Sequence, residues 1–391
     1  MADHEPRPAS ADCGCREHIS WACNRTTGAD RSASKGLALK LAASLGLGGK
    51  QNFQAQVQKI VDLEKVGLDV VTGGEAWSFD IFTKLAYVAA RTERVQLATS
   101  IVNVYSRSAT TIAVTAASLD EMSGGRFILG LGSSGAQVIE GFHGIPFTKP
   151  LSHIVDVIGV CRLVWGREKV IYSGSAITVP LPPDQGLGLG KALHVMDYPL
   201  RSDIPIWWAA LTQKAVEKAA EVADGWIPIH LIPEMVKPVW GVALAAGFAK
   251  RADTVGPRLP FEIAAQANVA IGEHLPVQEL RDRYRPHLAL YVGGMGARGA
   301  NFYNDMAVAF GYPHEAKLIQ DLYLDGKKDE AARYVPADWL EKAQLIGPKS
   351  YVKERLAAFD EAGVTTLSIN PVGGLDPVET VATMRELVDD L

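Results

Sequence analysis

Apolar residues along the chain follow two spacings that alternate from Leu37 onward. Short, nearly continuous apolar runs are followed by longer stretches in which apolar residues recur every three or four positions. This alternation predicts parallel strands that are connected by helices. The runs with the strand pattern are 37–43, 68–72, 95–102, 126–132, 204–211, 226–230, 261–271 and 364–370. Eight such units are the number that closes a (β/α)8 TIM barrel, which is therefore the fold class we expect.

The segment from Leu119 to Gly135 shows this pattern most clearly. A helical spacing ends at Leu119, and Ser123-Gly124-Gly125 follows, where glycine can close a helix. The continuous apolar run from Phe127 to Leu131 predicts a strand that is covered on both faces. Gly132-Ser133-Ser134-Gly135 then lies at the carboxyl end of that strand, where barrel enzymes keep their sites. Small residues there allow backbone N–H groups to approach an anion, although an ordinary strand-to-helix turn would look the same.

Two connections are too long for ordinary barrel loops. The first, about 166–201, is rich in glycine and proline, and the second, about 272–348, contains helical patterns of its own. Both follow the carboxyl side of a strand, directly or through a helix, so we expect both to lie over the mouth of the barrel. Residues 1–36 lack apolar periodicity and are expected to form a disordered arm, which leaves 37–391 as the barrel domain.

Composition and charge exclude several classes of partner. The 391 residues include 39 basic and 44 acidic side chains, for a formal net charge of -5, and 48% are hydrophobic. The sequence has no long basic run and no stretch of about twenty apolar residues, so we expect neither a nucleic-acid nor a membrane partner. The pattern of a secretion signal is missing from the N-terminus, which favours a cytoplasmic location.

Four cysteines are too few for a disulfide scaffold in a chain of this length. Cys13, Cys15 and Cys23 lie near His18 and could in principle hold zinc. Their spacing lacks a second paired motif, however, so incidental thiols are the better interpretation and we expect no metal site. Cys161 falls on an apolar helical face and is expected in the core.

Two further segments carry candidate binding residues. A predicted strand passes directly into a helix start along Ala209, Ala210, Leu211, Thr212, Gln213 and Lys214. The free N–H groups of a first helical turn, the helix dipole and a lysine together would bind a phosphate, although a plain surface helix cap has the same pattern. In the third predicted strand, a polar step at Ser100 and Ile101 before Asn103 indicates a bulge that could push backbone toward a planar ligand, or else chance composition.

Glu75 is the candidate acid-base residue. It follows Gly73-Gly74 at the carboxyl end of the second predicted strand, where a carboxylate could point into the barrel mouth and manage a proton. The alternative is a solvated loop charge. His143, beyond the fourth-strand loop, is better interpreted as structural. The sequence carries no serine-hydrolase elbow, zinc-protease pair or P-loop, and its Gly130-x-Gly132-x-x-Gly135 match to a dinucleotide fingerprint begins inside a strand and is therefore superficial.

Taken together, these segments resemble the bacterial luciferase-like superfamily, and within it the branch of oxidoreductases that depend on coenzyme F420, a deazaflavin. The resemblance is carried by Ala90–Leu97, Ser123–Gly132, Ala223–Trp226 and Leu288–Gly299. It implies a homodimer with the deazaflavin at the carboxyl mouth of each barrel. It also implies a bulge in the third strand that contains a non-proline cis peptide bond, at the place of Ser100-Ile101 here.

The resemblance also assigns residues to the parts of the coenzyme. It places Glu75 beside the ring, in the neighbourhood of the third-strand bulge. The loop that lines the coenzyme's tail matches Ser133, Ser134, Gly135 and Gln137, and the turn that receives its phosphate matches the segment from Ala209 to Lys214. The second assignment agrees with the helix-terminus argument made from the residues alone.

Three departures from the family pattern limit what the resemblance implies, and the first two change the reaction that we expect. Members that oxidise alcohols or sugar phosphates have a histidine where this chain has Ala76, and a glutamate where it has Gly135. Without those groups, oxidation of an alcohol would lack a proton acceptor. We therefore expect hydride transfer from reduced coenzyme F420 to an activated alkene, imine or carbonyl. The third departure is Thr212-Gln213-Lys214, where relatives have Gly-Pro-Lys. An FMN-dependent monooxygenase and a non-catalytic binding barrel are the alternatives.

Overall fold

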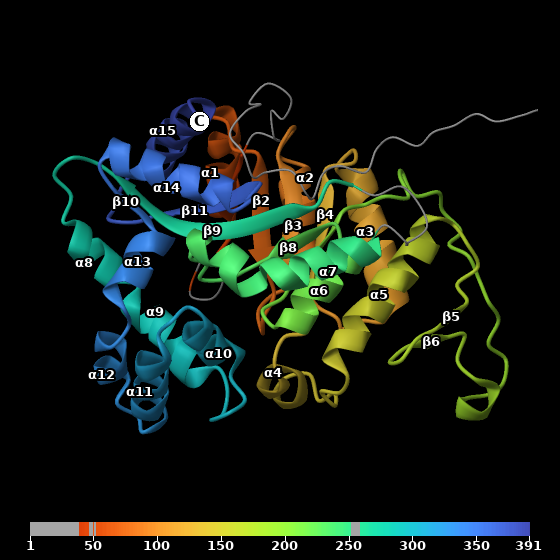
Figure 1. Cartoon of the computed structure of the whole chain (residues 1–391). Coiled ribbons are helices and arrows are strands. Elements are labelled where there is room, and N and C mark those ends of the chain that lie inside the picture. The colour runs from red at the N-terminus through yellow and green to blue at the C-terminus, as the bar shows by residue number, and fades with distance from the viewer. Residues whose placement is uncertain (1–38, 47–49, 51, 252–258) are drawn as a thin grey trace, which may run out of the picture. The chain divides into compact units, whose positions relative to one another are not determined.

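Eight parallel strands close into a barrel, and helices cover its outside (Figure 1). The computed structural model describes residues 39–46, 50, 52–251 and 259–391. In the order of their pairing, the barrel strands are β1 (Lys40–Ser44), β2 (Val70–Gly74), β3 (Gln96–Asn103), β4 (Phe127–Gly132), β7 (Ile206–Ala209), β8 (Gly225–Ile227), β9 (Glu262–Ile271) and β11 (Thr366–Pro371). Pairing of β8 with β9 and of β11 with β1 completes the ring. The (β/α)8 barrel expected from the sequence is confirmed.

Several helices around the barrel begin after a residue whose side chain caps them. Asp80, Ser108, Thr212 and Asp376 each accept a hydrogen bond from a backbone N–H in the first turn of the helix that follows, which satisfies a donor that the helix itself cannot pair. The covering helices are α1 (Phe53–Lys65), α2 (Ile81–Ala89), α3 (Ala109–Met122), α4 (Ala136–Gly141), α5 (Pro150–Trp165), α6 (Gln213–Val222), α7 (Gly241–Arg251), α14 (Lys349–Glu361) and α15 (Pro377–Asp389).

The inside of the barrel is filled mainly by small side chains and one large one. The interior cluster consists of Ala42, Val70, Ala98, Ile128, Trp207 and Ala264. Trp207 is 1% exposed and occupies the space that the alanines leave. Toward the amino ends of the strands, Lys40 Nζ lies 2.6 Å from Glu262 Oε2. Cys161 is fully buried among the packed helices, as expected.

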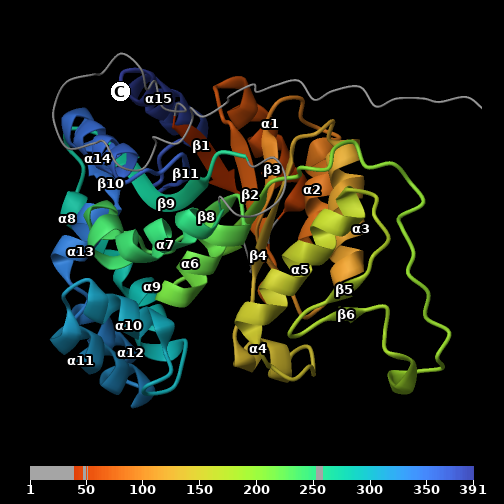
Figure 2. The same ribbon diagram turned by 45° about the vertical axis from the view of Figure 1, so that its right-hand side comes forward.

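The second insertion forms a group of helices beyond β9. They are α8 (Val277–Asp282), α9 (Arg285–Ala289), the π-helical turn η4 (Leu290–Gly294), α10 (Phe302–Ala309), α11 (Pro313–Leu324), α12 (Lys328–Arg333) and α13 (Ala337–Ala343). Both ribbon views place α10, α11 and α12 toward the same end of the barrel as α4, which follows the carboxyl end of β4 (Figures 1 and 2). A ninth strand, β10 (Leu345–Gly347), brings the chain back and pairs with the end of β9.

The first insertion begins with a hairpin that packs on the side of α5. Its strands are β5 (Tyr172–Ser173) and β6 (Thr178–Val179), and both ribbon views place them beside α5 (Figure 2). The buried Asp156 of α5 fixes it by accepting hydrogen bonds from the N–H groups of Ala176 and Ile177, at 2.7 and 2.9 Å. A groove of about 360 Å³ separates the hairpin from the loop after β3. This insertion therefore borders the mouth at one edge.

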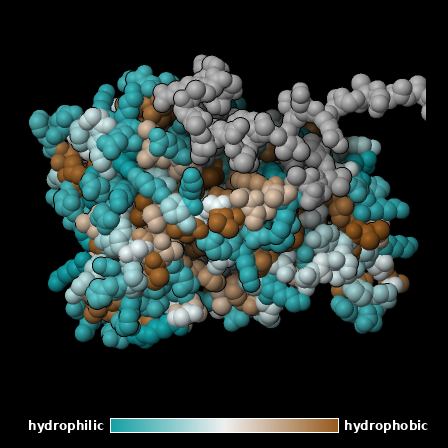
Figure 3. Space-filling model, in the orientation of Figure 1, coloured by the Kyte–Doolittle hydropathy of each residue, from teal (hydrophilic) through white to brown (hydrophobic). Residues whose placement is uncertain are grey.

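The face of the molecule in Figure 3 is mostly hydrophilic, with apolar residues in small groups. None of the helices in the described part of the chain is long and apolar enough to cross a membrane.

Candidate active site

Strand β3 bulges where it passes β4. Gly73 of β2 lies opposite Thr99 and Gly74 lies opposite Ile101, so Ser100 is the extra residue. The Thr99 hydroxyl replaces the backbone hydrogen bonds that the bulge interrupts between β3 and β4. Its Oγ1 accepts a hydrogen bond from Gly130 N at 2.7 Å and donates one to Gly130 O at 3.0 Å. A Cβ on Gly130 would lie 1.6 Å from the Thr99 carbonyl oxygen, so this approach requires glycine. The bulge expected from the sequence is confirmed.

The expected cis peptide bond between Ser100 and Ile101 is wrong. In the described residues the cis bond is Val179–Pro180, and the bond at the bulge is trans. One extra residue suffices to produce the bulge, and a trans bond avoids the roughly 3 kcal/mol that a non-proline cis bond costs.

The bulge brings Ile101 to the mouth of the barrel. Its side chain is 36% exposed. A Cβ on Gly132 would lie 2.8 Å from Ile101 Cγ2 and 3.8 Å from Ala209 Cβ, so the three residues adjoin. We call Ile101, Gly132 and Ala209 the apolar platform. A flat ring can lie against such a surface because only one side chain of any size projects from it.

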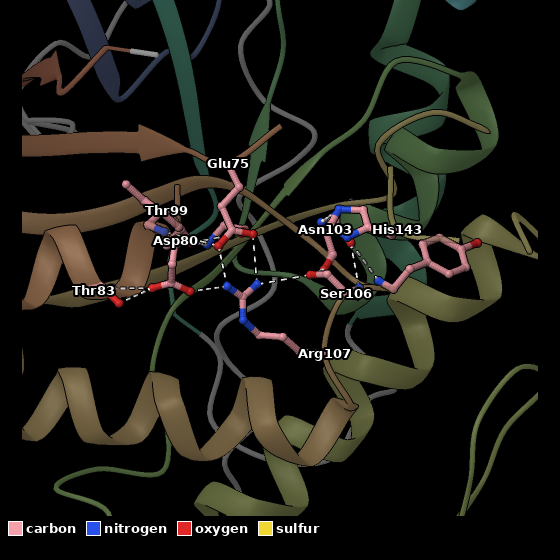
Figure 4. Close-up of polar contacts among 11 residues, drawn as sticks. Glu75, Asp80, Thr83, Thr99, Asn103, Ser106, Arg107 and His143 are labelled. Atoms are coloured by element: carbon pink, nitrogen blue, oxygen red, sulfur yellow. Dashed lines mark hydrogen bonds and ion pairs between the residues drawn. The ribbon is translucent and has the colours of Figure 1, made fainter. Parts of the chain in front are cut away.

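Glu75 lies directly after β2 and is buried against a cation (Figure 4). Its Oε2 and Oε1 accept hydrogen bonds from Arg107 Nη1 and Nη2 at 2.9 and 2.6 Å. Its backbone N–H donates to Ile101 O at 3.2 Å, which ties the loop to the bulge. Since Glu75 is only 5% exposed, the alternative of a solvated loop charge is wrong. With both oxygens on a guanidinium, the carboxylate acts as an anchor for the β2 loop.

Asp80 is a second carboxylate on the same guanidinium. It caps α2 by accepting a hydrogen bond from Thr83 N at 2.6 Å, and it also accepts one from Arg107 Nη2. Burial alone would raise the pKa of Asp80, but the hydrogen bonds from Thr83 and Arg107 outweigh burial and lower it. For Arg107, burial acts to lower the pKa, and the carboxylates of Glu75 and Asp80 reverse this and raise it. Both shifts favour the charged forms of Asp80 and Arg107.

Asn103 organises the turn after β3. Its Oδ1 accepts hydrogen bonds from Tyr105 N at 3.2 Å and Ser106 N at 2.8 Å, and its Nδ2 lies 3.4 Å from His143 Nε2 (Figure 4). Asn103 is 3% exposed. Both Asn103 and His143 are thus engaged with protein groups, which agrees with the structural interpretation of His143.

The loop after β4 leaves open space beside the apolar platform. Ser133 donates to Ser134 O at 3.1 Å, and Ser134 has a φ of +58°. Gly135 is the N-cap residue of α4, and a Cβ built on it meets nothing within 4 Å. Gln137, in the first turn of α4, is exposed. The small residues of this loop therefore leave room for a ligand at the rim.

The loop after β7 is fixed by two buried tryptophans. Trp226 Nε1 donates to Ala210 O at 2.8 Å, and Trp240 Nε1 donates to Leu211 O at 2.9 Å. These bonds leave the N-terminus of α6 at the surface, with Thr212 as its cap and an exposed Lys214 in the first turn. Gln213 is held elsewhere, because its Nε2 donates to Val239 O at 2.6 Å. Free N–H groups and one cation remain to receive an anion.

The structure adds a histidine that the sequence analysis missed. His230 follows β8, is 4% exposed and has a φ of +52°. Its Nδ1 lies 3.0 Å from the hydroxyl of Tyr284, and its backbone oxygen accepts a hydrogen bond from Trp339 Nε1 at 3.0 Å. Its Nε2 is buried and has no hydrogen-bond partner among the described residues. Burial, helped by the nearby His287, lowers the pKa of His230 to about 3.

A cavity of about 720 Å³ opens beside His230. It lies at the carboxyl ends of β9, β11 and β1, on the side of the barrel that the apolar platform does not occupy. In the described part of the chain, no three His, Cys, Asp or Glu residues are placed to hold a metal ion. Cys13, Cys15, Cys23 and His18 lie outside the described residues. The polar strand residues that line the cavity are Ser44, Gln266, Asn268, Ser368 and Asn370.

The buried histidine predicts a loss of stability in acid. An unfolded histidine has a pKa of about 6.5, so below that pH the unfolded chain binds a proton that the folded His230 does not. Stability should therefore be full above pH 6.5 and fall by up to about 1.4 kcal/mol per pH unit as the pH drops toward the folded pKa. Urea unfolding at pH 7 and pH 5 would measure this, with His230→Asn as the comparison because asparagine tolerates a positive φ. We expect the wild type to lose about 2 kcal/mol more than the variant over this interval. Equal losses would contradict the prediction.

Comparison with known proteins gives a consistent result. The family model described as luciferase-like monooxygenase matches residues 34–366. A Mycobacterium tuberculosis protein named "Putative coenzyme F420-dependent oxidoreductase" is 38% identical over 347 residues, which span 88% of this chain and 99% of that protein. A 5,10-methylenetetrahydromethanopterin reductase of Archaeoglobus fulgidus is 24% identical over 295 residues, which span 75% of this chain and 82% of the reductase.

Solved structures share the fold at low identity. The coenzyme F420-dependent tetrahydromethanopterin reductase of Methanopyrus kandleri superposes with a TM-score of 0.71 at 18% identity, covering 90% of this chain and 99% of that one. The FMN-bound oxygenating component of 3,6-diketocamphane monooxygenase from Pseudomonas putida superposes with a TM-score of 0.60 at 16% identity, covering 90% and 98%. The family match and the relative at 38% identity decide the assignment. This chain belongs to the luciferase-like monooxygenase family.

Proposed function

We propose that this protein is an oxidoreductase that binds coenzyme F420 and reduces a small organic substrate by hydride transfer. The observation that carries the proposal is the bulge of β3, which presents Ile101 beside Gly132 and Ala209 as an apolar platform at the barrel mouth. The relative at 38% identity, whose name includes dependence on coenzyme F420, supports the choice of cofactor.

The residues around the platform fit a deazaflavin with a phosphate-bearing tail. The ring would lie against Ile101, and the tail would pass the small residues Ser133, Ser134 and Gly135, with Gln137 at the rim. The exposed N-terminus of α6, with Lys214, would receive the phosphate. When bound, the coenzyme supplies the hydride. The chain's own part is to hold one face of the ring, order the loops and exclude water.

The charges near the platform favour reduction over alcohol oxidation. An alcohol must lose a proton as it is oxidised, so a base is needed close to the ring. Glu75 is bound at both oxygens by Arg107, and Ala76 and Gly135 carry no acid-base group. We therefore favour an activated alkene, imine or carbonyl as the substrate that accepts the hydride.

A titration of the purified protein with coenzyme F420 and, separately, with FMN would test the cofactor. We expect binding of the deazaflavin, followed by its oxidation from the reduced form when an acceptor from a panel of conjugated alkenes, imines and ketones is added. Tight FMN binding without deazaflavin binding would favour a monooxygenase, as would oxygen consumption. Binding of neither would favour a non-catalytic barrel.

Lys214→Ala should weaken coenzyme F420 binding about tenfold without lowering stability, because a charge-assisted hydrogen bond to a phosphate contributes roughly 1.5 kcal/mol or more. Lys218→Ala is the matched control, since it removes the same charge from the next turn of α6, where Lys218 pairs with Glu221. Fluorescence titration at two salt concentrations would measure both. Equal affinities for the two variants would place the phosphate elsewhere.

A further inference from the structure

The half of the mouth formed by β8, β9, β11 and β1 lies outside the proposed coenzyme contacts. Side chains alternate along a strand, and Ala42 and Ala264 point into the barrel interior. Ser44 of β1 and Gln266 of β9 therefore point the same way, two residues further toward the mouth. Ser368 of β11 is in register with Ala42 and Gln266, so it points to the same side. The cavity of about 720 Å³ lies over this half and has a size typical of small-molecule sites.

We propose that this cavity holds the substrate and that His230, held by Tyr284, binds the carbonyl oxygen of an α,β-unsaturated carbonyl compound through its Nε2–H group. The inference rests on the proposed function for its source of hydride. It goes beyond that function by naming the substrate class and the residue that recognises it.

We assign the proton of the neutral His230 ring to Nε2 on the basis of the contact that Nδ1 makes. Tyr284 is half-buried, and burial raises the pKa of its hydroxyl, so the hydroxyl keeps a proton that it can donate. It lies 3.0 Å from His230 Nδ1, and a neutral imidazole that accepts at Nδ1 carries its proton at Nε2. His230 stays neutral at physiological pH because burial and His287 disfavour the cation. Nε2–H is thus a buried donor without a partner among the described residues.

An unpaired buried donor costs about 1–3 kcal/mol, so it is expected where a ligand completes the pairing. The surrounding structure holds His230 in place despite this cost and despite its positive φ. Trp339 binds its backbone oxygen, and Tyr284 binds its ring. Both residues come from the second insertion. That insertion therefore builds the environment of His230.

His230 follows β8, which is the strand next to the one that carries Ala209 of the apolar platform. Ile227 of β8 is in register with Ala209 of β7, and His230 follows three residues after Ile227. A substrate that reaches His230 from the cavity thus lies beside the strand that carries Ala209. The proposal requires the reducible bond of the substrate to reach from His230 toward this strand, where the ring would lie.

The lining of the cavity limits the charge of the substrate. It contains amides and hydroxyls, with Lys59 and Arg283 as its strong cations, and no carboxylate belongs to the described residues that line it. A cationic substrate would find no opposite charge among these described lining residues, whereas an anionic substrate would find Lys59 and Arg283. A neutral substrate needs no opposite charge. The amides of Asn268 and Asn370, which are hydrogen-bonded to each other at 2.9 Å, are available to further polar groups.

The reaction that follows is balanced by one hydride and one proton. The hydride forms a C–H bond at the alkene carbon far from the carbonyl, the alkene π electrons form a double bond to the carbonyl carbon, and the carbonyl π electrons move onto the oxygen. The Nε2–H group of His230 donates to that oxygen as its negative charge develops, which a neutral imidazole can do without losing its own proton. A proton from water then completes the reduction at the carbon next to the carbonyl. The substrate gains two electrons, and the coenzyme loses them.

The first test observes His230 directly in the full-length protein. With ¹⁵N-labelled histidine, NMR should show a neutral ring protonated at Nε2, assigned by its loss in His230→Asn. Cyclohex-2-enone should shift the Nε2 signal, and cyclohexene, which lacks the oxygen, should not. No shift with the enone, or equal shifts with both probes, would overturn the inference. This readout needs no coenzyme, so it is independent of the proposed function.

The second test measures turnover of cyclohex-2-enone by protein saturated with reduced coenzyme F420. His230→Asn should lower kcat about 10²-fold, the effect of removing one donor to a developing oxyanion. Asparagine keeps the positive φ but is too short to reach the position of Nε2. Tyr284→Phe should also lower kcat, and Tyr334→Phe, an exposed tyrosine of the same insertion, should not.

Coenzyme affinity distinguishes a failure of the proposed function from a failure of the role proposed for His230. It should be unchanged in all three variants. Failure of the wild type to bind the coenzyme would count against the proposed function, whereas unchanged kcat in His230→Asn would overturn the role of His230.

Discussion

Replacing Arg107 with alanine is expected to lower the free energy of unfolding by about 3–5 kcal/mol, the cost of removing one partner from a buried ion pair. Arg107 donates to both oxygens of Glu75, whose side chain is 7% exposed. Without the guanidinium, that carboxylate would keep the N–H of Ile81, at 3.3 Å, as a donor. Urea unfolding followed by tryptophan fluorescence would measure the loss.

Two comparisons make the Arg107 result specific. Arg298→Ala removes an arginine that is paired with Asp321 and is 57% exposed, and it should cost less than about 1 kcal/mol. The double change of Arg107→Ala with Glu75→Gln should cost less than Arg107→Ala alone, because no buried charge is then left unpaired. A loss in Arg107→Ala as small as that in Arg298→Ala would contradict a buried ion pair.

Among substitutions that add one methyl group near the site, Gly130→Ala is expected to lower the stability most. Its Cβ would lie 1.6 Å from the Thr99 carbonyl oxygen and 2.8 Å from that of Ser100, and both contacts are with backbone. Overpacking of a core typically costs about 1–3 kcal/mol when side chains can adjust. Here β3 itself must move, so we expect a larger loss, together with loss of coenzyme binding because Ile101 would shift. Thermal unfolding and a coenzyme titration would detect the two effects.

Gly135→Ala is the control for Gly130→Ala. It adds the same methyl group three residues beyond β4, where a Cβ meets nothing within 4 Å and the φ of −127° suits any residue. Its stability should stay within about 0.5 kcal/mol of the wild type. Gly132→Ala should fall between the two, since its nearest contact is the side chain of Ile101 at 2.8 Å. Equal stability of all three variants would show that the backbone of β3 does not closely approach Gly130 of β4.

The barrel could be predicted from sequence because each strand is marked by its own apolar run. The ends of the strands were less accurate where tertiary hydrogen bonds or proline intervene. The expected strand 226–230 ends at Ile227, since Pro228 has no N–H for the ladder. The expected strand 204–211 ends at Ala209, where the next two carbonyls bind tryptophan side chains instead. The three-residue β10 was missed because so short a run has no measurable period.

Sequence reasoning could propose site residues only where a residue's neighbours in sequence are also its neighbours in space, and the ligand contacts of those residues stay predictions. The loops after β3, β4 and β7 are such cases. Glu75 was identified, but its partner Arg107 is 32 residues away, and nothing local connects the two. His230 was missed for the same reason, because Tyr284 and Trp339 lie 54 and 109 residues further along the chain. Its place just after a strand, before an insertion rich in tyrosine, is the signal that could have found it.

The pairing of β10 with β9 has a consequence for how this fold can change. The second insertion leaves the barrel from the end of β9 and returns through β10 to the same strand, in register from Val269 to Ile271. Its entry and exit are therefore fastened side by side. A segment anchored in this way can be replaced by another of different length without altering the eight strands. The eight strands and the loops at their ends can thus stay unchanged while the segment varies.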